Sequence, residues 1–160
     1  MMRFAQRTVA SATLLMLMTT AAPLAAKAAE TDAAFFAISV EHFDESLEWY
    51  ARHLEFTVES DSENEQRRGA LLVRPGAVLE IAAFSDAVDR DSIAPNVESH
   101  QMFGIFKLGF VVDDLDAAFE TLSAAGVDIF FPIVNAAGGR RTFGIRDPEG
   151  NIIQFLSDPE

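Results

Sequence analysis

The last strand-like segment of the chain contains one polar residue whose position suggests chemistry. Residues 146–155 read RDPEGNIIQF, in which Asp-Pro-x-Gly is typical of a turn. The strand that follows alternates between two faces, and one face holds Gln154 between the apolar residues Ile152 and Leu156. A neutral amide both donates and accepts hydrogen bonds, but it carries no charge to balance a cation. Its presence among apolar neighbours therefore needs an explanation.

The other residue types that commonly do chemistry form no motif. The chain has no cysteine, which excludes disulfides, thiolate nucleophiles and thiolate metal sites. Each of the three histidines has a structural explanation: His42 starts a helix, His53 lies near that helix's C-terminus, where a cation is favoured, and His100 lies in a loop. Gly-x-Ser-x-Gly, Walker and dinucleotide-binding motifs are absent from the sequence.

Residues 1–28 have the composition of a secretory signal peptide, since Arg3 and Arg7 precede a short apolar run. That run is shorter than the roughly 20 residues that span a bilayer. We expect cleavage near Ala28 and a periplasmic or secreted mature chain, residues 29–160, that forms one domain and has no membrane span.

The expected mature chain is strongly acidic. Residues 1–28 hold three basic residues and no acidic residue, so their removal changes the net charge from −13 to −16. This charge argues against nucleic acid as a partner. It favours a cationic ligand, although an acidic surface that keeps an exported protein soluble is the simpler explanation.

The chain contains a weak internal repeat. Residues 37–56 and 109–127 each read as a strand that runs into an amphipathic helix. Asp44 or Ser46 is expected to cap the first helix, and Gly126 to end the second.

Three strand-like segments follow each of these helices. They are residues 56–60, 69–73 and 78–84 after the first helix, and residues 127–131, 141–146 and 151–156 after the second. The sequence therefore predicts an α+β fold of two βαβββ modules, at about 34–84 and 104–157, joined by a polar linker at 85–103.

Three motifs accompany these modules: Val40-x-x-Phe43-x-x-Ser46-x-x-Trp49-Tyr50, Val112-x-Asp114-Leu115-Asp116 and Arg146-Asp147-Pro148-x-Gly150-Asn151. With them the chain resembles the vicinal oxygen chelate superfamily, which includes glyoxalase I, bleomycin-resistance proteins and extradiol dioxygenases. The resemblance covers about residues 34–157 and implies an open, barrel-like sheet that bears a cleft. It also allows a homodimer whose subunits share their clefts. Glu55 replaces the glycine that usually ends the first helix, at a cost of about 1 kcal/mol if it is left-handed.

In this superfamily up to four metal ligands come from the first and last strands of each module. By the resemblance, the same positions here hold Phe35, Glu80, Lys107 and Gln154. Phenylalanine has no donor atom and a protonated lysine repels a cation, whereas a metal catalyst needs about three protein ligands. The resemblance thus implies a site without metal or cofactor, and it argues against metal-dependent glyoxalase and dioxygenase activities.

We expect the ligand-binding residues to share one concave face; they are Phe35, Ser39, Glu80, Lys107 and Gln154. There Gln154 would donate to Glu80 and accept from Lys107. The alternative is an ion pair between Lys107 and Glu80 that has only a structural role.

Three functions remain open from the sequence. The first is an exported, metal-independent protein that binds a small organic molecule in the cleft between the modules. The second is a metal-free lyase or isomerase with Lys107 and Glu80 as catalytic candidates. The third is a protein-interaction module whose cleft is closed by side chains.

Overall fold

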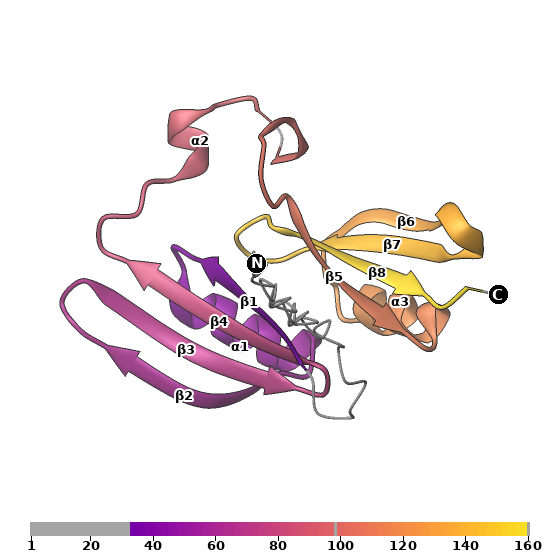
Figure 1. Cartoon of the computed structure of the whole chain (residues 1–160), viewed down its shortest axis with the longest axis horizontal. Coiled ribbons are helices and arrows are strands. Elements are labelled where there is room, and N and C mark those ends of the chain that lie inside the picture. The colour runs from indigo at the N-terminus through magenta and orange to yellow at the C-terminus, as the bar shows by residue number, and fades with distance from the viewer. Residues whose placement is uncertain (1–32, 98, 160) are drawn as a thin grey trace, which may run out of the picture. The chain divides into compact units, whose positions relative to one another are not determined.

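The computed structural model describes residues 33–97 and 99–159 (Figure 1). The signal peptide expected at residues 1–28 lies outside the described residues. Module one contains β1 (Ala34–Ser39), α1 (Phe43–His53), β2 (Thr57–Glu63), β3 (Arg67–Arg74) and β4 (Ala77–Phe84). The linker contains α2 (Arg90–Ile93) and the 3-10 turn η1 (Ser99–Gln101). Module two contains β5 (Lys107–Val112), α3 (Leu115–Ala124), β6 (Ile129–Asn135), η2 (Ala137–Gly139), β7 (Arg141–Arg146) and β8 (Ile152–Ser157).

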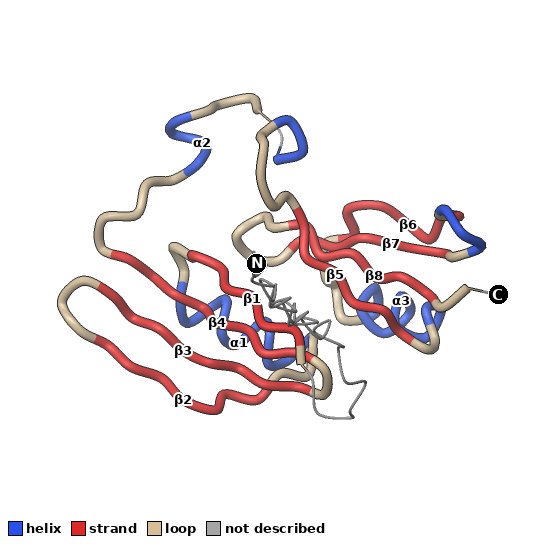
Figure 2. The backbone as a smooth tube through the Cα atoms, in the orientation of Figure 1, coloured by secondary structure: helices blue, strands red, loops and turns tan. Residues whose placement is uncertain are grey.

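Each module is a four-stranded mixed sheet with a helix against one face, as Figure 2 shows by colour. The strand orders are β1-β4-β3-β2 and β5-β8-β7-β6, and in each sheet the first strand runs parallel to the last. Helix α1 packs against β3 and β4, and α3 packs against β7 and β8. The predicted pair of βαβββ modules is confirmed. Within the described residues the two sheets are not hydrogen-bonded to each other, so they form no closed barrel.

Several strands are longer than their predicted segments. β3 begins at Arg67, two residues before the predicted start, and β6 continues to Asn135. The linker, which was expected to be irregular, contains the short helix α2, whose first turn is capped by Asp89. The longer β3 matters for the site because it adds Arg67 to the sheet face that carries Gly69 and Leu71.

The two main helices begin in different ways. Asp114 caps α3 by accepting a hydrogen bond from the Ala117 N–H at 2.9 Å. The expected cap of α1 by Asp44 or Ser46 is wrong, because the N-cap residue is His42 and no side chain of α1 caps it. Instead, Glu149 of the β7–β8 turn accepts from the His42 N–H at 2.7 Å. The N-terminus of α1 is thus completed by a carboxylate of module two.

Helix α1 is followed by a left-handed residue, a conformation that the sequence had left open. Glu55 has φ of 57° in the position where the resemblance places a glycine. The Phe56 N–H then bonds back to the Tyr50 carbonyl at 3.4 Å. A non-glycine residue in this conformation costs about 1 kcal/mol. Gly126 adopts the same conformation after α3, with φ of 75°.

A buried hydrogen-bond network connects the modules. The Tyr50 side chain is 0% exposed, and its hydroxyl donates to Asp147 Oδ2 at 2.8 Å. Asp147 is 5% exposed and also accepts from the Asn151 backbone N–H at 2.7 Å and side-chain Nδ2 at 2.9 Å. Burial raises the pKa of Asp147, although these hydrogen bonds lower it. Burial, followed by the Asp147 charge, raises the pKa of Tyr50 well above its ordinary range.

Aromatic rings extend this junction toward the first strands of the two modules. The ring centroid of Phe110 on β5 lies 6.0 Å from that of Phe36 on β1 and 6.3 Å from that of Phe56. Phe110 also packs on Phe155 of β8 at 5.9 Å. These contacts place β1 and β5 on the two sides of one junction.

Candidate functional site

The predicted site residues line three cavities that share residues, rather than one cluster. The first, which we call the β1–β5 cleft, has a volume of about 360 Å³ and is lined by Phe35, Ser39 and Lys107 among others. Glu80 lines a second cavity of about 350 Å³ over the sheet of module one, with Phe35 at both cavities. Gln154 lines a third, of about 320 Å³, over module two, with Lys107 at both cavities.

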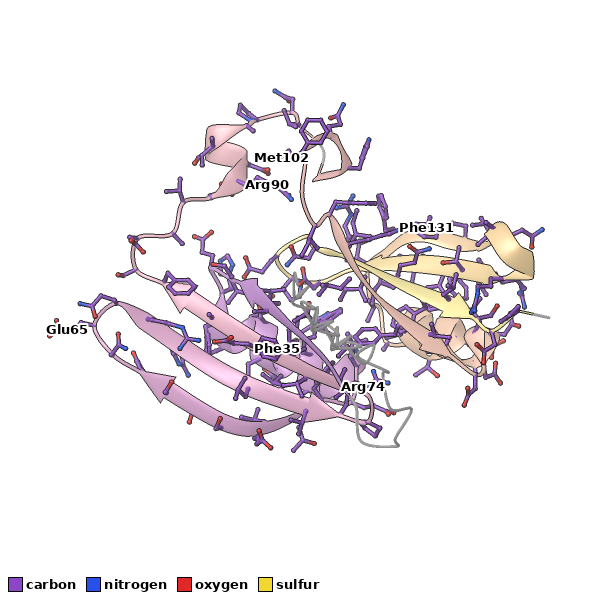
Figure 3. The ribbon with its side chains drawn as sticks, viewed as in Figure 1. Phe35, Glu65, Arg74, Arg90, Met102 and Phe131 are labelled. Atoms are coloured by element: carbon purple, nitrogen blue, oxygen red, sulfur yellow. The ribbon has the colours of Figure 1, made fainter. Side chains whose placement is uncertain are left out.

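The β1–β5 cleft is mainly apolar. Its lining consists of residues 35–39 of β1, residues 105–108 at the start of β5, Arg90 of α2, Asn151 and Ile152. Phe35 is 62% exposed, and Figure 3 labels this ring on β1 and Arg90 on α2. An apolar concave site with a few polar groups at its edges is the usual form of a small-molecule site.

Glu80 does not face Lys107. Its carboxylate is paired with the Arg67 guanidinium. Gly69 makes this possible because a Cβ there would lie 2.6 Å from Arg67 Nη2, so the guanidinium lies flat over the glycine. The alternative of an ion pair between Lys107 and Glu80 is therefore wrong, since Glu80 is paired with Arg67 on the adjacent strand β3.

Gln154 bonds neither Glu80 nor Lys107. Its side-chain Nε2 donates to Thr142 Oγ1 at 2.7 Å, and Thr142 Oγ1 donates to the Phe155 carbonyl at 2.6 Å. Since the hydroxyl proton is committed to that carbonyl, Thr142 has only acceptor capacity left for position 154. A donor is required there, which an amide supplies and an ionised carboxylate does not.

Lys107 keeps its charge available. Its side chain is exposed, and within the described residues its ammonium is in no salt bridge. Its Nζ lies 5.1 Å from the centroid of the Phe106 ring, a cation–π contact between neighbours along the chain. Of the predicted site residues, Lys107 is thus the charged group best placed to meet a ligand.

In the vicinal oxygen chelate superfamily four positions supply metal ligands, and the residues at these positions here do not fit a divalent ion. Phe35 offers no donor, Lys107 is a cation, and Glu80 is already paired with Arg67. Among residues 33–97 and 99–159, no three histidine, cysteine, aspartate or glutamate side chains are grouped to hold a metal ion.

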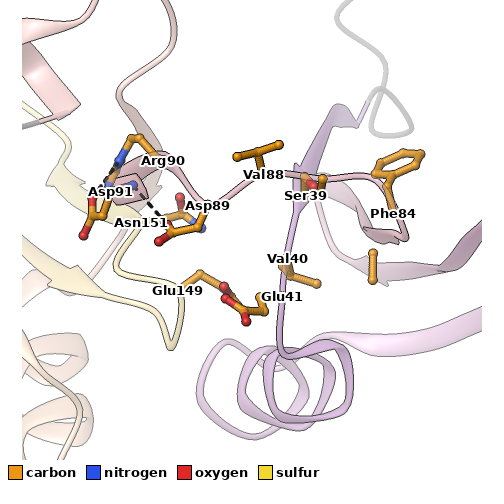
Figure 4. A pocket seen from close by; sticks show the side chains of 12 residues that line it. Ser39, Val40, Glu41, Phe84, Val88, Asp89, Arg90, Asp91, Glu149 and Asn151 are labelled. Atoms are coloured by element: carbon orange, nitrogen blue, oxygen red, sulfur yellow. Dashed lines mark hydrogen bonds and ion pairs between the residues drawn. The ribbon is translucent and has the colours of Figure 1, made fainter. Parts of the chain in front are cut away.

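A further cavity, which we call the acidic cavity, lies next to the β1–β5 cleft and has a volume of about 470 Å³ (Figure 4). The two share Ser39, Arg90 and Asn151. The acidic cavity is also lined by the carboxylates of Glu41, Asp89, Asp91 and Glu149. Three of these already have partners, since Asp89 caps α2, Glu149 completes α1 and Asp91 lies 3.7 Å from Arg90.

The sequence did not identify Arg67, Arg90 and Asn151, which line these cavities, or Thr142, which bonds Gln154. Arg67 was outside the predicted strand, and Arg90 was in a linker read as irregular. Thr142 had a usable signal, because it alternates with the apolar residues Phe143 and Ile145 along β7 and so faces the other side of the sheet.

Comparison with known proteins identifies the family. Residues 33–155 match the model of the Glyoxalase/Bleomycin resistance protein/Dioxygenase superfamily. The chain belongs to this superfamily, because the match covers most of its length and its fold is the paired βαβββ arrangement described above.

Solved structures agree on the fold. A glyoxylase/bleomycin resistance protein/dioxygenase domain from Frankia sp. EAN1pec is 20% identical, with a TM-score of 0.62 over 79% of this chain and 97% of that chain. TnmS3, described as an antibiotic binding protein from Streptomyces sp. CB03234, is also 20% identical, with a TM-score of 0.59 over 81% of this chain and 97% of that chain. No curated protein gives a significant sequence match. Within the described residues, no helix is long and apolar enough to cross a membrane.

Proposed function

We propose that this protein is an exported, metal-independent member of its superfamily that binds a small organic molecule in the β1–β5 cleft. The main support is the cleft itself, a mainly apolar cavity of about 360 Å³. Its wall holds the exposed ring of Phe35 and a lysine that forms no ion pair within the described part of the chain. The description of TnmS3 as an antibiotic binding protein supports a binding role for this fold.

The two alternative functions receive less support. A lyase or isomerase that uses Lys107 and Glu80 together needs both groups at one substrate, but Glu80 is paired with Arg67 and lines a different cavity. An interaction module needs a cleft closed by side chains, whereas the β1–β5 cleft has room for a small molecule. Binding without turnover is the simplest function for the geometry.

Native mass spectrometry of the protein purified from its source tests the binding. We expect a non-covalent small-molecule adduct that is lost on denaturation. Ala37→Trp places a bulky ring in the cleft and should remove the adduct, while Val134→Trp on the exposed part of β6 should retain it. Equal adducts in both variants, or no adduct in the parent protein, would contradict the proposal.

Export is tested separately by N-terminal sequencing of the protein recovered outside the cytoplasm. We expect the chain to begin near Ala29. Recovery of a full-length chain in the membrane fraction would contradict this part of the proposal and leave the binding function intact.

A further inference from the structure

The charge of the β1–β5 cleft is opposite to that of the chain. Acidic residues outnumber basic residues by 25 to 12 in the sequence. Yet among the described residues that line the cleft, the ionisable ones are the cations Arg90 and Lys107, and the other polar ones, Ser39 and Asn151, are neutral. These two side chains place positive charge in the wall of the cleft, while the carboxylates nearest to it line the neighbouring acidic cavity.

Arg90 and Lys107 have few ion-pair partners among the described residues. Most of the other described arginines have close partners, such as Glu80 for Arg67 and the Ser157 carbonyl for Arg140, whose Nη1 donates at 2.6 Å. Within the part of the chain that the structure describes, the Arg90 side chain is paired only with its sequence neighbour Asp91, with 3.7 Å between Nε and Oδ1. Lys107 has no ion pair among the described residues. Two basic groups at one apolar cavity thus keep most of their capacity for an external anion.

The apolar wall of the cleft indicates the chemistry of the uncharged part of the ligand. Phe35, Ile105 and Phe106 line the cleft and are 62%, 92% and 41% exposed. Covering these side chains would remove apolar surface from water at a gain of roughly 25 cal/mol per Å². An occupant therefore needs an apolar body as well as an anionic end.

We propose that the ligand of the β1–β5 cleft is an apolar organic anion, a carboxylate on a hydrophobic body, and that Arg90 and Lys107 bind its charged end. This inference rests on the proposed binding function and specifies its ligand class. It replaces the cationic ligand that the net charge of the whole chain favoured. The acidic cavity beside the cleft adds selectivity, because its carboxylates disfavour any pose that carries the anion past Arg90.

The test uses three probes with one apolar body, decanoate, decanol and decylammonium, each titrated into the full mature protein below its micelle concentration. Decanoate should bind more tightly than decanol, and its advantage should shrink as salt is added. Lys107→Met and Arg90→Met should each weaken decanoate binding by about fivefold to tenfold and leave decanol binding unchanged. Arg52→Met removes the same charge from an exposed site on α1 and is the matched control.

The outcomes separate the inference from the function on which it rests. If decanol binds but the two variants bind decanoate as well as the parent protein does, or lose decanol equally, the anionic ligand class is wrong and the binding function stands. If none of the three probes binds, both are wrong. Circular dichroism of each variant confirms that the fold is retained, as expected for these exposed side chains.

Discussion

The two modules satisfy equivalent polar positions in opposite ways. Glu80 and Gln154 occupy matching places on β4 and β8, the final strands of the two modules. Val78 pairs with Phe35, and Glu80 lies two residues after Val78. In the same way Ile152 pairs with Lys107, and Gln154 lies two residues after Ile152. Glu80 is neutralised by Arg67, whereas Gln154 donates to Thr142. An ion pair in one sheet and a neutral amide chain in the other both leave the polar group bonded within its own module.

In each module a glycine lies under a covering side chain. In module one Gly69 lies under the Arg67 guanidinium, and in module two Gly144 lies under the ring of Phe131. A flexible, polar side chain covers the first sheet and a rigid aromatic ring covers the second. The modules therefore share a topology but differ in how rigidly their concave faces are filled.

The turns that precede β4 and β8 are stabilised by different polar groups, and they give the largest predicted effect on the free energy of unfolding. Asp147 of the β7–β8 turn is a buried acceptor, while Arg74 before the β3–β4 turn donates to the Leu54 carbonyl at 2.9 Å. Asp147→Ala leaves several donors without a partner and should lower the free energy of unfolding by about 3 kcal/mol. Arg74→Met should cost about 1 kcal/mol. Urea unfolding measures both, and equal losses would contradict the assigned difference.

The glycine pair gives the second prediction. Gly144→Ala places a Cβ 2.3 Å from Phe131 Cε1, so a packed ring must move, and we expect a loss of about 1–3 kcal/mol. Gly69→Ala meets only the end of the Arg67 side chain, which can turn away, so the expected loss is below about 1 kcal/mol. Thermal unfolding of the two variants decides the order, and a larger loss at Gly69 would show that module one is the more rigid.

Exchanging the two polar residues gives the third prediction. Gln154→Glu puts a carboxylate against an acceptor oxygen and should cost about 1–2 kcal/mol at neutral pH. Protonation turns this carboxyl into a donor, so the loss should shrink as the pH falls through the pKa of the new residue. The matched change Glu80→Gln removes the ionised partner of Arg67 and should cost about 1 kcal/mol at neutral pH. A pH-independent loss in Gln154→Glu would contradict the donor requirement.

The fourth prediction concerns the phenol of Tyr50 at high pH. An unfolded tyrosine ionises near its ordinary pKa of 10.0, while the folded state keeps Tyr50 protonated because burial and the Asp147 charge raise the pKa. The folded state therefore binds more protons above this pH, and its stability should fall by up to about 1.4 kcal/mol per pH unit. Tyr50→Phe should abolish this part of the fall. An unchanged alkaline slope in the variant would show that Tyr50 ionises normally in the fold.

Local sequence signals predicted the element order but not the polar partners. The Asp-Pro-x-Gly turn, the period of two in β8 and Gly126 after α3 depend on neighbouring residues, and the structure confirms them. Side-chain partners depend on strand register, which a single sequence fixes poorly. Arg67 reaches Glu80 only because β3 starts two residues before its predicted start.

The residues of the candidate site were likewise predicted where they lie on regular strands and missed where they do not. Phe35, Ser39 and Lys107 do line one cleft, as their places on the first strands suggested. Arg90 was missed because its contribution depends on the path of the linker, which carries no periodic signal. The net charge of the chain, likewise, does not describe the charge of a cavity whose described lining holds two cations.

The most direct test of the binding claim is a titration of decanoate followed by the amide NMR spectrum of the mature protein. We expect saturable shifts at residues 35–39 of β1 and at residues 105–108, which lead into β5, with smaller changes over α3, which packs against β7 and β8. Lys107→Met should weaken these same shifts without moving them to other residues. Saturable shifts confined to other elements, or none at all, would contradict a small-molecule site in the β1–β5 cleft.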